Sequence, residues 1–385
     1  MTDSVSSRKY DESRRLGLGV SFISRRRASG VPRFLAADLS GSAGTEALRA
    51  DRARVGEFIR SPLSDGDTLD PFAARADKEY VFAPDRGAAL AYRSLFGVAL
   101  GSGDPIGARD QFQDCLRQFV SQSDGLGLRP VIMLVREDRL ALYQRLGFKT
   151  LYLGDEAILD VASFTLDSPR MRNVRQAVKR SANFGVTTEI MHEVDIPPSL
   201  IDSLREITVR ARHGKREEGF SAALEEPFSV PQPTCLVAVC RDRMGTPIGF
   251  QRYSSCSGDT KLSVDAMRRV PSAPNGTGER MIFEVIQWAR DNGIIELSLN
   301  FVAFRKLLQS LDVASGNGTV ARAIRHFNPA GAPRLFAFTN KFRPQWVSRY
   351  LAYRSLSDIP RFALATLSAE GRLPPWVARL GTRSL

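Results

Sequence analysis

Residues 249–300 read GFQRYSSCSGDTKLSVDAMRRVPSAPNGTGERMIFEVIQWARDNGIIELSLN, and this stretch decides the fold. Two apolar runs, at 250–253 and 261–267, are separated by Ser, Gly and Asp, which is typical of two strands joined by a turn. Residues 279–291 place apolar side chains three or four positions apart, which predicts an amphipathic helix. A glycine stops this helix, and residues 295–300 form a buried strand that ends in a polar Asn. This order of elements predicts an α/β fold.

The loop before that helix, residues 271–278, contains Pro, Asn and Gly at positions suited to sharp turns. The start of a helix presents unpaired backbone N–H groups, which can bind an anion. Asp265 and Arg268 come just before the loop and would stand beside such a site. The alternative is a tight strand-to-helix connection next to a solvated arginine, and these residues alone favour neither.

The whole chain has 385 residues and a net charge of +12. Its length predicts two or three domains, and its charge indicates a polyanionic partner, which is RNA, DNA or an anionic membrane. The four cysteines form no CxxC pair and the three histidines are scattered. We therefore expect reduced thiols in a cytoplasmic protein, and no metal site. No apolar run reaches the roughly 18 residues that a membrane span needs.

Composition and periodicity divide the chain into four predicted segments. Residues 1–50 are rich in Ser, Arg, Gly and Ala without periodicity, which predicts a flexible basic arm. Residues 51–165 and 185–385 each alternate strand-like apolar runs with helical patterns, which predicts two α/β domains. Residues 166–184 connect them as a basic helix.

The basic helix reads SPRMRNVRQAVKRSANFG over residues 168–185, with Ser168 as its expected N-cap. Arg172, Arg175 and Lys179 follow one another at i, i+3 and i+7, so they form a cationic stripe beside an apolar one. The stretch contains no acidic residue for the usual i, i+4 ion pairs. This composition favours a phosphate-bearing partner, and a merely solvated helix face is the alternative.

Several motifs resemble known families. LALYQRLGFKTLYLGDEAIL, residues 140–159, resembles the end of the GNAT acyltransferase fold, in which a short helix leads into the final strand. The chain as a whole resembles the phosphatidylglycerol lysyltransferase C-terminal domain family, also known as DUF2156. The motifs that carry this resemblance are, in chain order, GDEAILDVASFTLDSPRMRNVRQAVKR, GKREEGFS, GFQRY, VDAMRR with PNG, LNFVAFR and FTNKFRPQWVSRYL.

The resemblance covers roughly residues 50–354 and implies a tandem GNAT-like α/β fold, with mixed sheets, flanking helices and a basic helix between the domains. It implies transfer of an amino acid from aminoacyl-tRNA to a hydroxyl or amine acceptor, in this family most often phosphatidylglycerol. Aminoacyl-tRNA is then a co-substrate, and no cofactor is expected. We also expect peripheral contact with the inner face of an anionic membrane. The sequence does not set the oligomeric state.

The resemblance also implies which residues act. The family's DxxR motif falls on Asp265 and Arg268, and the lysine of its KFxPxW motif falls on Lys341, which makes these three the expected catalytic residues. The expected substrate-binding residues are Asn275, Gly276, Asn300 and Arg305, and the expected tRNA-binding residues are Arg172, Arg175 and Lys179. The sequence shows no Ser/His/Asp or Cys/His arrangement, which favours direct transfer over a covalent enzyme intermediate.

Departures from the family pattern leave the donor and the acceptor open. GAPRLF, residues 331–336, stands where members often have QIESLY, and we expect no multi-span flippase region in this sequence. The acceptor is then phosphatidylglycerol, another lipid, a peptide or a secondary metabolite. The loop PNGTGERM partly resembles a pyrophosphate-binding loop, so a CoA-dependent GNAT N-acyltransferase is one rival function. A non-catalytic module that binds RNA or a membrane is the other.

Overall fold

The structure is a computed structural model that describes residues 42–62, 66–212, 227–306, 308–309 and 331–371, together with Leu373 and Val377. Two predicted features therefore lie outside the described residues. They are the first 41 residues of the predicted arm and the GKREEGFS motif.

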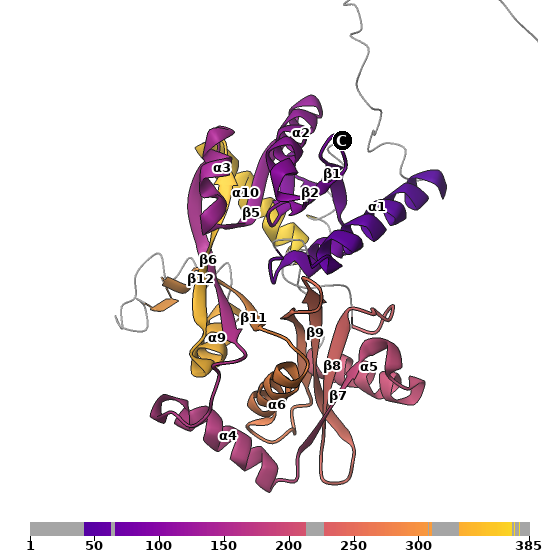
Figure 1. The fold of residues 1–385 in the computed structure, drawn as a ribbon, viewed down its shortest axis with the longest axis vertical. Coiled ribbons are helices and arrows are strands. Elements are labelled where there is room, and N and C mark those ends of the chain that lie inside the picture. The colour runs from indigo at the N-terminus through magenta and orange to yellow at the C-terminus, as the bar shows by residue number, and fades with distance from the viewer. Residues whose placement is uncertain are drawn as a thin grey trace, which may run out of the picture. The chain divides into compact units, whose positions relative to one another are not determined.

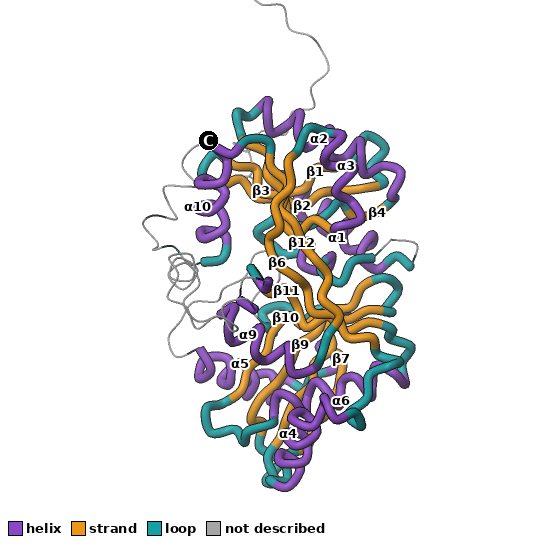
Figure 2. The backbone as a smooth tube through the Cα atoms, turned by 90° about the vertical axis from the view of Figure 1, so that its left-hand side faces the viewer, coloured by secondary structure: helices purple, strands orange, loops and turns teal. Residues whose placement is uncertain are grey.

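The described strands form one 12-stranded mixed sheet, in the order β1-β2-β3-β5-β12-β6-β11-β10-β9-β8-β7, with β4 paired to β2. The strands are β1 (Glu79–Phe82), β2 (Ala88–Leu95), β3 (Val98–Ser102), β4 (Ile106–Gly107), β5 (Arg129–Arg136), β6 (Lys149–Asp160), β7 (Thr187–His192), β8 (Cys235–Arg241), β9 (Pro247–Cys256), β10 (Lys261–Arg269), β11 (Glu296–Ala303) and β12 (Gln345–Tyr353). Figure 2 shows them as a central band with helices on both sides.

The α-helices are α1 (Ser42–Arg60), α2 (Phe112–Gly125), α3 (Leu140–Arg145), α4 (Arg172–Asn183), α5 (Pro198–Arg212), α6 (Thr277–Asp291), α9 (Gly331–Thr339) and α10 (Ile359–Ala369). Residues 42–50 were expected in the flexible arm, but they are the first half of α1. The helix forms because Val55 and Ile59, on its later turns, are buried against Ala73 and Ala89. Tertiary packing of this kind supplies most helix stability, and composition alone does not show it.

The same order of elements occurs twice. In the first half, β3 leads through α2 into β5, and β3 and β5 pair in parallel. In the second half, β10 leads through α6 into β11, and these two strands also pair in parallel. Each half continues through a short helix into a last strand, α3 into β6 and α9 into β12. This repetition confirms the predicted tandem GNAT-like α/β fold.

The two halves exchange their last strands. β6, from the first half, pairs with β11, while β12, from the second half, pairs with β5. β6 and β12 also pair with each other, and Figure 1 shows them side by side at the centre of the fold. The sheet therefore runs without a break across the predicted boundary at residue 165. The domain limits themselves stay predictions.

The stretch that suggested the fold has the predicted order of elements. β9, β10 and α6 lie where two strands and a helix were expected, and the apolar stripe of α6 is fully buried at Ile282, Val285 and Ile286. The expectation that the last strand ends at Asn300 is wrong, because β11 continues to Ala303. The strand passes Asn300 through an irregular step with a φ of 76°.

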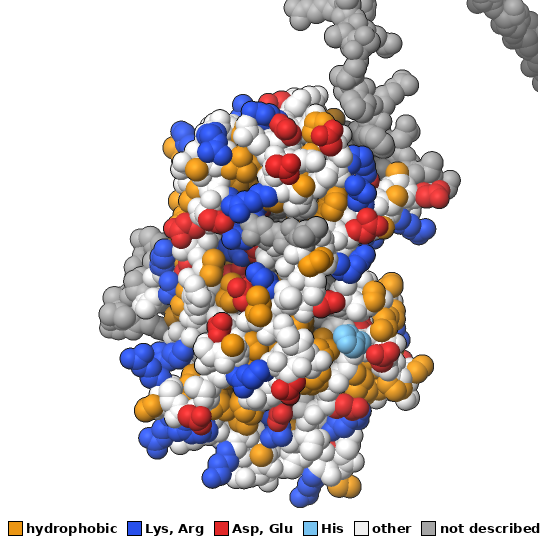
Figure 3. Space-filling view, in the orientation of Figure 1, with side chains coloured by type: hydrophobic (Ala, Val, Ile, Leu, Met, Phe, Trp, Pro, Cys, Tyr) orange, Lys and Arg blue, Asp and Glu red, His pale blue; other side chains and the backbone are white. Residues whose placement is uncertain are grey.

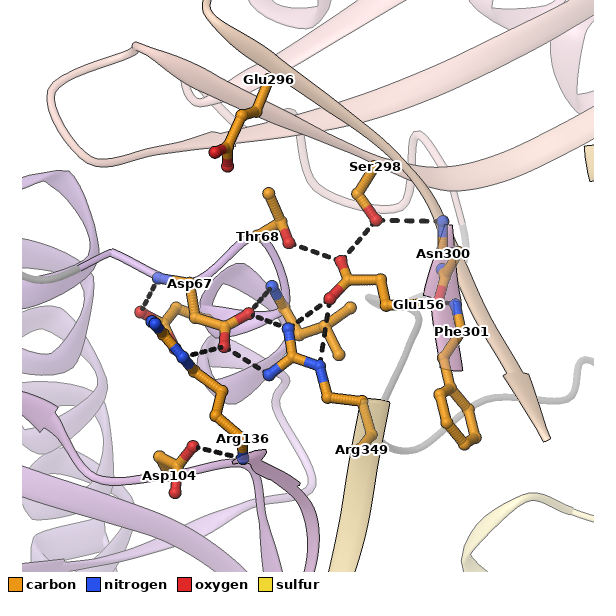
Figure 4. A network of polar contacts seen from close by, with 12 residues as sticks. Asp67, Thr68, Asp104, Arg136, Glu156, Glu296, Ser298, Asn300, Phe301 and Arg349 are labelled. Atoms are coloured by element: carbon orange, nitrogen blue, oxygen red, sulfur yellow. Dashed lines mark hydrogen bonds and ion pairs between the residues drawn. The ribbon is translucent and has the colours of Figure 1, made fainter. Parts of the chain in front are cut away.

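A buried ionic network holds the middle of the sheet (Figure 4). Arg349 of β12 is 2% exposed and donates hydrogen bonds of 2.5 and 2.7 Å to Asp67, which lies in the loop after α1. The same guanidinium contacts Glu156 of β6, with Nε at 3.1 Å. Thr68 and Ser298 of β11 donate their hydroxyl hydrogens to Glu156. One side chain thus links elements from both halves.

The network sets the charge state of its carboxyl groups. Burial alone would raise the pKa of Asp67, but the Arg349 guanidinium and the Leu69 N–H outweigh it and lower the pKa to about 2. Burial and the neighbouring Asp67 carboxylate raise the pKa of Asp70 well above its usual range. Asp67 is therefore the ionised partner of Arg349.

We predict that Asp67→Asn lowers the free energy of unfolding at pH 7 by about 2 kcal/mol, because it removes a carboxylate whose pKa is depressed in the folded state. The contribution of a depressed pKa is present above the unfolded value of 3.8 and is lost as pH falls through about 2. Urea unfolding at pH 7 and at pH 3 measures both effects. Asp110→Asn, at an exposed position, is the control. Equal stability of the Asp67→Asn protein and the wild type at pH 7 would show that this carboxylate does not stabilise the fold.

Candidate functional site

A cleft of about 490 Å³ lies where α4, the turn before α6 and the short helical turn Asn340–Phe342 meet. α4 contributes Asn173, Gln176, Ala177 and Arg180, the turn contributes Asn275, Gly276, Thr277, Gly278 and Glu279, and Arg269, Phe338 and Lys341 complete the lining. The polar and charged members outnumber the apolar ones. Such a lining suits a polar ligand.

The turn is locked against α4. Gly276 has a φ of 99°, and a Cβ there would lie 2.2 Å from the carbonyl oxygen of Ala177. From the sheet below, the Gln251 side chain donates a 3.1 Å hydrogen bond to the carbonyl of Gly278. The first turn of α6 consequently faces the cleft in one fixed orientation. Its backbone N–H groups and the helix dipole make this end suitable for an anion.

Charged side chains line the same cleft. Lys341 Nζ lies 2.9 Å from Glu279 Oε1, and the two side chains are 43% and 13% exposed. The ammonium also lies 5.5 Å from the centre of the Phe338 ring. Arg180 and Arg269 add two more cations to the lining. With three cations and one carboxylate, the cleft has a net positive charge that favours an anionic ligand.

The structure brings only some of the predicted site residues together. Lys341, Asn275 and Gly276 line the cleft. Asp265 does not line it, because its side chain is 2% exposed and forms a 2.7 Å ion pair with Arg252. Arg268 is also outside the lining and donates a 3.1 Å hydrogen bond to the carbonyl of Met267.

Asp265 belongs to a buried triad. Arg252 contacts Asp265 on one side and Glu193, at 2.7 Å, on the other. Glu193 also accepts hydrogen bonds from the backbone N–H groups of Phe228 and Gln232. Arg252 therefore cross-links β10 to the segment that precedes α5. The triad lies in the packed interior rather than in the cleft lining.

The other two expected substrate-binding residues make structural contacts. The Asn300 amide donates a 2.8 Å hydrogen bond to the carbonyl of Val264 and stabilises the irregular step in β11. Arg305 pairs with Asp155 of β6, and its guanidinium lies 4.9 Å from the centre of the Trp346 ring. Neither residue lines the cleft.

The cationic stripe of α4 is smaller than the sequence predicted. Arg172 and Lys179 are exposed, but Arg175 is half-buried and donates to the carbonyl groups of Leu166 and Ser168. Ser168 is the N-cap of a short 3-10 turn, Pro169–Met171, which leads into α4 at Arg172, but its side chain makes no capping hydrogen bond. Arg175 instead satisfies carbonyl groups upstream of the helix.

Sequence reasoning missed the cleft residues Asn173, Gln176, Arg180, Arg269 and Glu279. Glu279 had a detectable signal, since it is the carboxylate in the first turn of the helix that follows the glycine loop. The α4 residues occur at i, i+3 and i+7, a face offset from the cationic stripe. Nothing in the sequence indicates which of the two faces meets the loop.

Residues 60–353 match the model of the family described as "Phosphatidylglycerol lysyltransferase, C-terminal". The chain belongs to this family. It is similar to the lysylphosphatidylglycerol biosynthesis bifunctional protein LysX of Mycobacterium avium, with 36% identity over 342 residues, 85% of this chain and 29% of the relative. LysX of Nocardia farcinica is 34% identical over 316 residues, 80% of this chain and 28% of the relative. The chain thus spans less than a third of the length of these curated relatives.

Two solved structures share the fold. The structure of L-PGS from Bacillus licheniformis matches with a TM-score of 0.72 and 21% identity, over 83% of this chain and 97% of that one. The C-terminal domain (DUF2156) of a putative lysylphosphatidylglycerol synthetase from Agrobacterium fabrum matches with a TM-score of 0.71 and 24% identity, over 84% and 98%. Within the described part of this chain, no helix has the length and apolar character to cross a bilayer.

The close contact between the turn and α4 can be tested by substituting Gly276 and, as a control, Gly278. We predict that Gly276→Ala disrupts the cleft and lowers the free energy of unfolding by more than about 1 kcal/mol, because a Cβ there collides with the Ala177 carbonyl at a positive φ. Gly278→Ala is the matched control, since its Cβ would meet only Phe338 and Gln251 at 3.5 Å or more. Thermal unfolding of both variants measures the difference, and equal melting temperatures would contradict the lock.

Proposed function

We propose that this chain is an aminoacyltransferase that moves an amino acid from aminoacyl-tRNA to a hydroxyl of phosphatidylglycerol or a closely related anionic lipid. One observation carries the proposal: a cationic cleft at the N-terminus of α6, with the Lys341–Glu279 pair in its lining, in a chain of the phosphatidylglycerol lysyltransferase family. No cofactor enters the proposed reaction, because an aminoacyl ester is already activated.

The lipid phosphate is the anion that best fits the first turn of α6. The first turn of α6 offers backbone N–H groups, and Arg269 and Arg180 supply cations on either side. A phosphodiester bound there is neutralised by both kinds of donor. Its glycerol headgroup then extends toward Lys341 and Glu279.

The reaction is an ester exchange. The acceptor oxygen attacks the carbonyl carbon of the aminoacyl ester, a new C–O bond forms, and the bond to the ribose oxygen of the tRNA breaks. The acceptor proton passes to that ribose oxygen, so no oxidant or reductant is needed. The Lys341 ammonium is placed to stabilise the oxyanion of the tetrahedral intermediate. Glu279 orients this ammonium and, alone among the described lining residues, offers a carboxylate to carry the proton.

The donor tRNA is assigned to the exposed cations of α4. Arg172 and Lys179 point away from the packed side of the helix, where Val174 and Ser181 are buried. They lie next to the cleft face of the same helix. A phosphate backbone bound along this stripe brings the aminoacylated end of the tRNA toward the cleft.

The reaction is tested directly by supplying purified chain with a charged tRNA pool and a lipid extract that contains phosphatidylglycerol. We expect an aminoacylated lipid, detected by mass spectrometry, that disappears when the tRNA is uncharged. Replacing the tRNA with acetyl-CoA and an amine tests the rival N-acyltransferase activity. Acyl transfer from CoA, without any transfer from tRNA, would overturn the proposal.

We predict that Lys341→Ala lowers kcat/KM for lipid aminoacylation by about 100-fold, because removal of one oxyanion-stabilising group typically has an effect of this size. The free energy of unfolding should change little, since the ion pair with Glu279 is partly exposed. Lys149→Ala, an exposed lysine outside the cleft lining, is the matched control. Full activity of the Lys341→Ala protein would remove this lysine from the mechanism.

We predict that Arg172→Gln combined with Lys179→Gln weakens tRNA binding and reduces the slope of log K against log salt by about 2, because two phosphate contacts are lost. Arg175→Gln should leave that slope unchanged, since its guanidinium is occupied by two backbone carbonyl groups. Filter binding at several salt concentrations measures all three proteins. An equal effect of Arg175→Gln would show that the sequence-predicted three-cation stripe acts as a unit.

A further inference from the structure

Two large apolar side chains are exposed on neighbouring surface segments, outside the cleft lining. Phe184, at the C-terminal end of α4, is 58% exposed, and Met244, in the turn between β8 and β9, is 80% exposed. β7 and β8 pair in antiparallel register with Thr187 opposite Arg241, so the chain between α4 and β7 runs beside the turn that follows β8. The two segments approach closely, because a Cβ on Gly185 would lie 2.8 Å from the Cβ of Arg243.

Both side chains are presented by a fixed backbone. The end of α4 closes with hydrogen bonds from the N–H of Phe184 to the carbonyl of Arg180 and from the N–H of Val186 to that of Ser181. In the β8–β9 turn, the Asp242 carboxylate accepts hydrogen bonds from the N–H groups of Met244 and Thr246, at 2.9 and 3.0 Å. The exposure is therefore built into two ordered turns.

Cations surround this apolar pair. Lys179 and Arg180 precede Phe184 on α4, and Arg243 precedes Met244; all three are exposed. In the same turn, the Asp242 carboxylate is engaged by backbone N–H groups. Figure 1 places α4 and the β8–β9 turn at the lower end of the view, where Figure 3 shows Lys and Arg side chains on the surface with Asp and Glu side chains among them. Apolar side chains within a cationic rim match an anionic bilayer, whose interface offers hydrocarbon beneath negative headgroups.

Phe184 also continues the face of α4 that lines the cleft. Ala177 and Arg180 line the cleft, and Phe184 follows Arg180 by four residues, so it continues that face by about one turn. A lipid whose headgroup lies in the cleft would therefore have its acyl chains near Phe184 and Met244.

We propose that Phe184, Met244 and Arg243 form a membrane tip that inserts into the surface of an anionic bilayer beside the mouth of the cleft. Vesicle binding by this tip is independent of the proposed function. Its role in delivering the lipid acceptor rests on that function. An apolar protein partner is the other possible occupant, and the experiment below separates the two.

The first experiment measures co-sedimentation of the full 385-residue chain with phosphatidylglycerol-containing vesicles. Phe184→Ser combined with Met244→Ser should lower the partition coefficient by about tenfold or more, because two apolar insertions are lost. The matched control combines Val209→Ser and Leu356→Ser, which are 66% and 68% exposed elsewhere and should bind as the wild type does. Arg243→Gln should weaken binding to anionic vesicles and leave the weak binding to phosphatidylcholine vesicles unchanged.

A second experiment locates the insertion. The four cysteines, Cys115, Cys235, Cys240 and Cys256, are all buried, so Met244→Cys provides a single accessible position for an environment-sensitive dye. With anionic vesicles, the dye should shift to the blue and be quenched by brominated lipids, whereas a dye attached through Leu356→Cys should not respond. Three outcomes would each contradict the membrane tip. They are no vesicle binding by the wild type, unchanged binding by the double variant, and no spectral change of the dye at position 244.

Activity separates the two proposals. The Phe184→Ser, Met244→Ser protein should keep its transfer rate with a monomeric short-chain phosphatidylglycerol and lose it with vesicles. If no acceptor is aminoacylated while vesicle binding follows the pattern above, the proposed function fails and the membrane tip stands. Equal loss with monomeric and vesicular lipid would show that the tip acts on the cleft rather than on the membrane.

Discussion

The ion pairs of Arg349 are the constraint on which the arrangement of both halves depends. A buried guanidinium is costly unless its partners surround it, and here Asp67 and Glu156 do so from the loop after α1 and from β6. Arg349 itself lies on β12, the strand that the second half places beside the first. Because Lys341 precedes this strand by only a few residues, the network also determines where the lysine reaches the cleft. The position of Lys341 in the cleft thus depends on the buried network through β12.

Local sequence patterns predicted the elements well where a segment's neighbours in the chain decide its conformation. The helical spacing of Ile282, Val285 and Ile286 predicted α6, and all three are fully buried. The loop glycines predicted a sharp turn, and Gly276 adopts the positive φ that only glycine accepts readily. β11 ran past its expected end because pairing with β6 continues beyond Asn300, and this partner is about 150 residues away in the chain.

Which residues line the cleft depends on contacts between distant parts of the chain, and no local sequence pattern encodes these contacts. Asp265 looked like a residue of the loop mouth, but its charge is satisfied by Arg252, which in turn contacts Glu193 from another part of the chain. Arg175 fitted a cationic stripe, but it bonds to the carbonyl groups of Leu166 and Ser168, upstream of the helix. In both cases the sequence shows a charged residue, but only its partner in the folded chain determines whether the side chain faces solvent or supports the fold. Lys341 avoided this ambiguity because its partner Glu279 lies in the cleft as well.

α4 contains no acidic residue, and the roles of its three faces explain why. Val174 and Ser181 are packed inward, Arg172 and Lys179 form an exposed cationic stripe, and Asn173, Gln176 and Arg180 line the cleft. A carboxylate on either exposed face would repel a phosphate, whether it belongs to a nucleic acid or to a lipid headgroup. The i, i+4 ion pairs that stabilise an isolated helix are replaced here by packing of α4 against α6 and by the Gly276–Ala177 contact. The helix thereby presents positive charge on two faces and the exposed Phe184 at its C-terminal end.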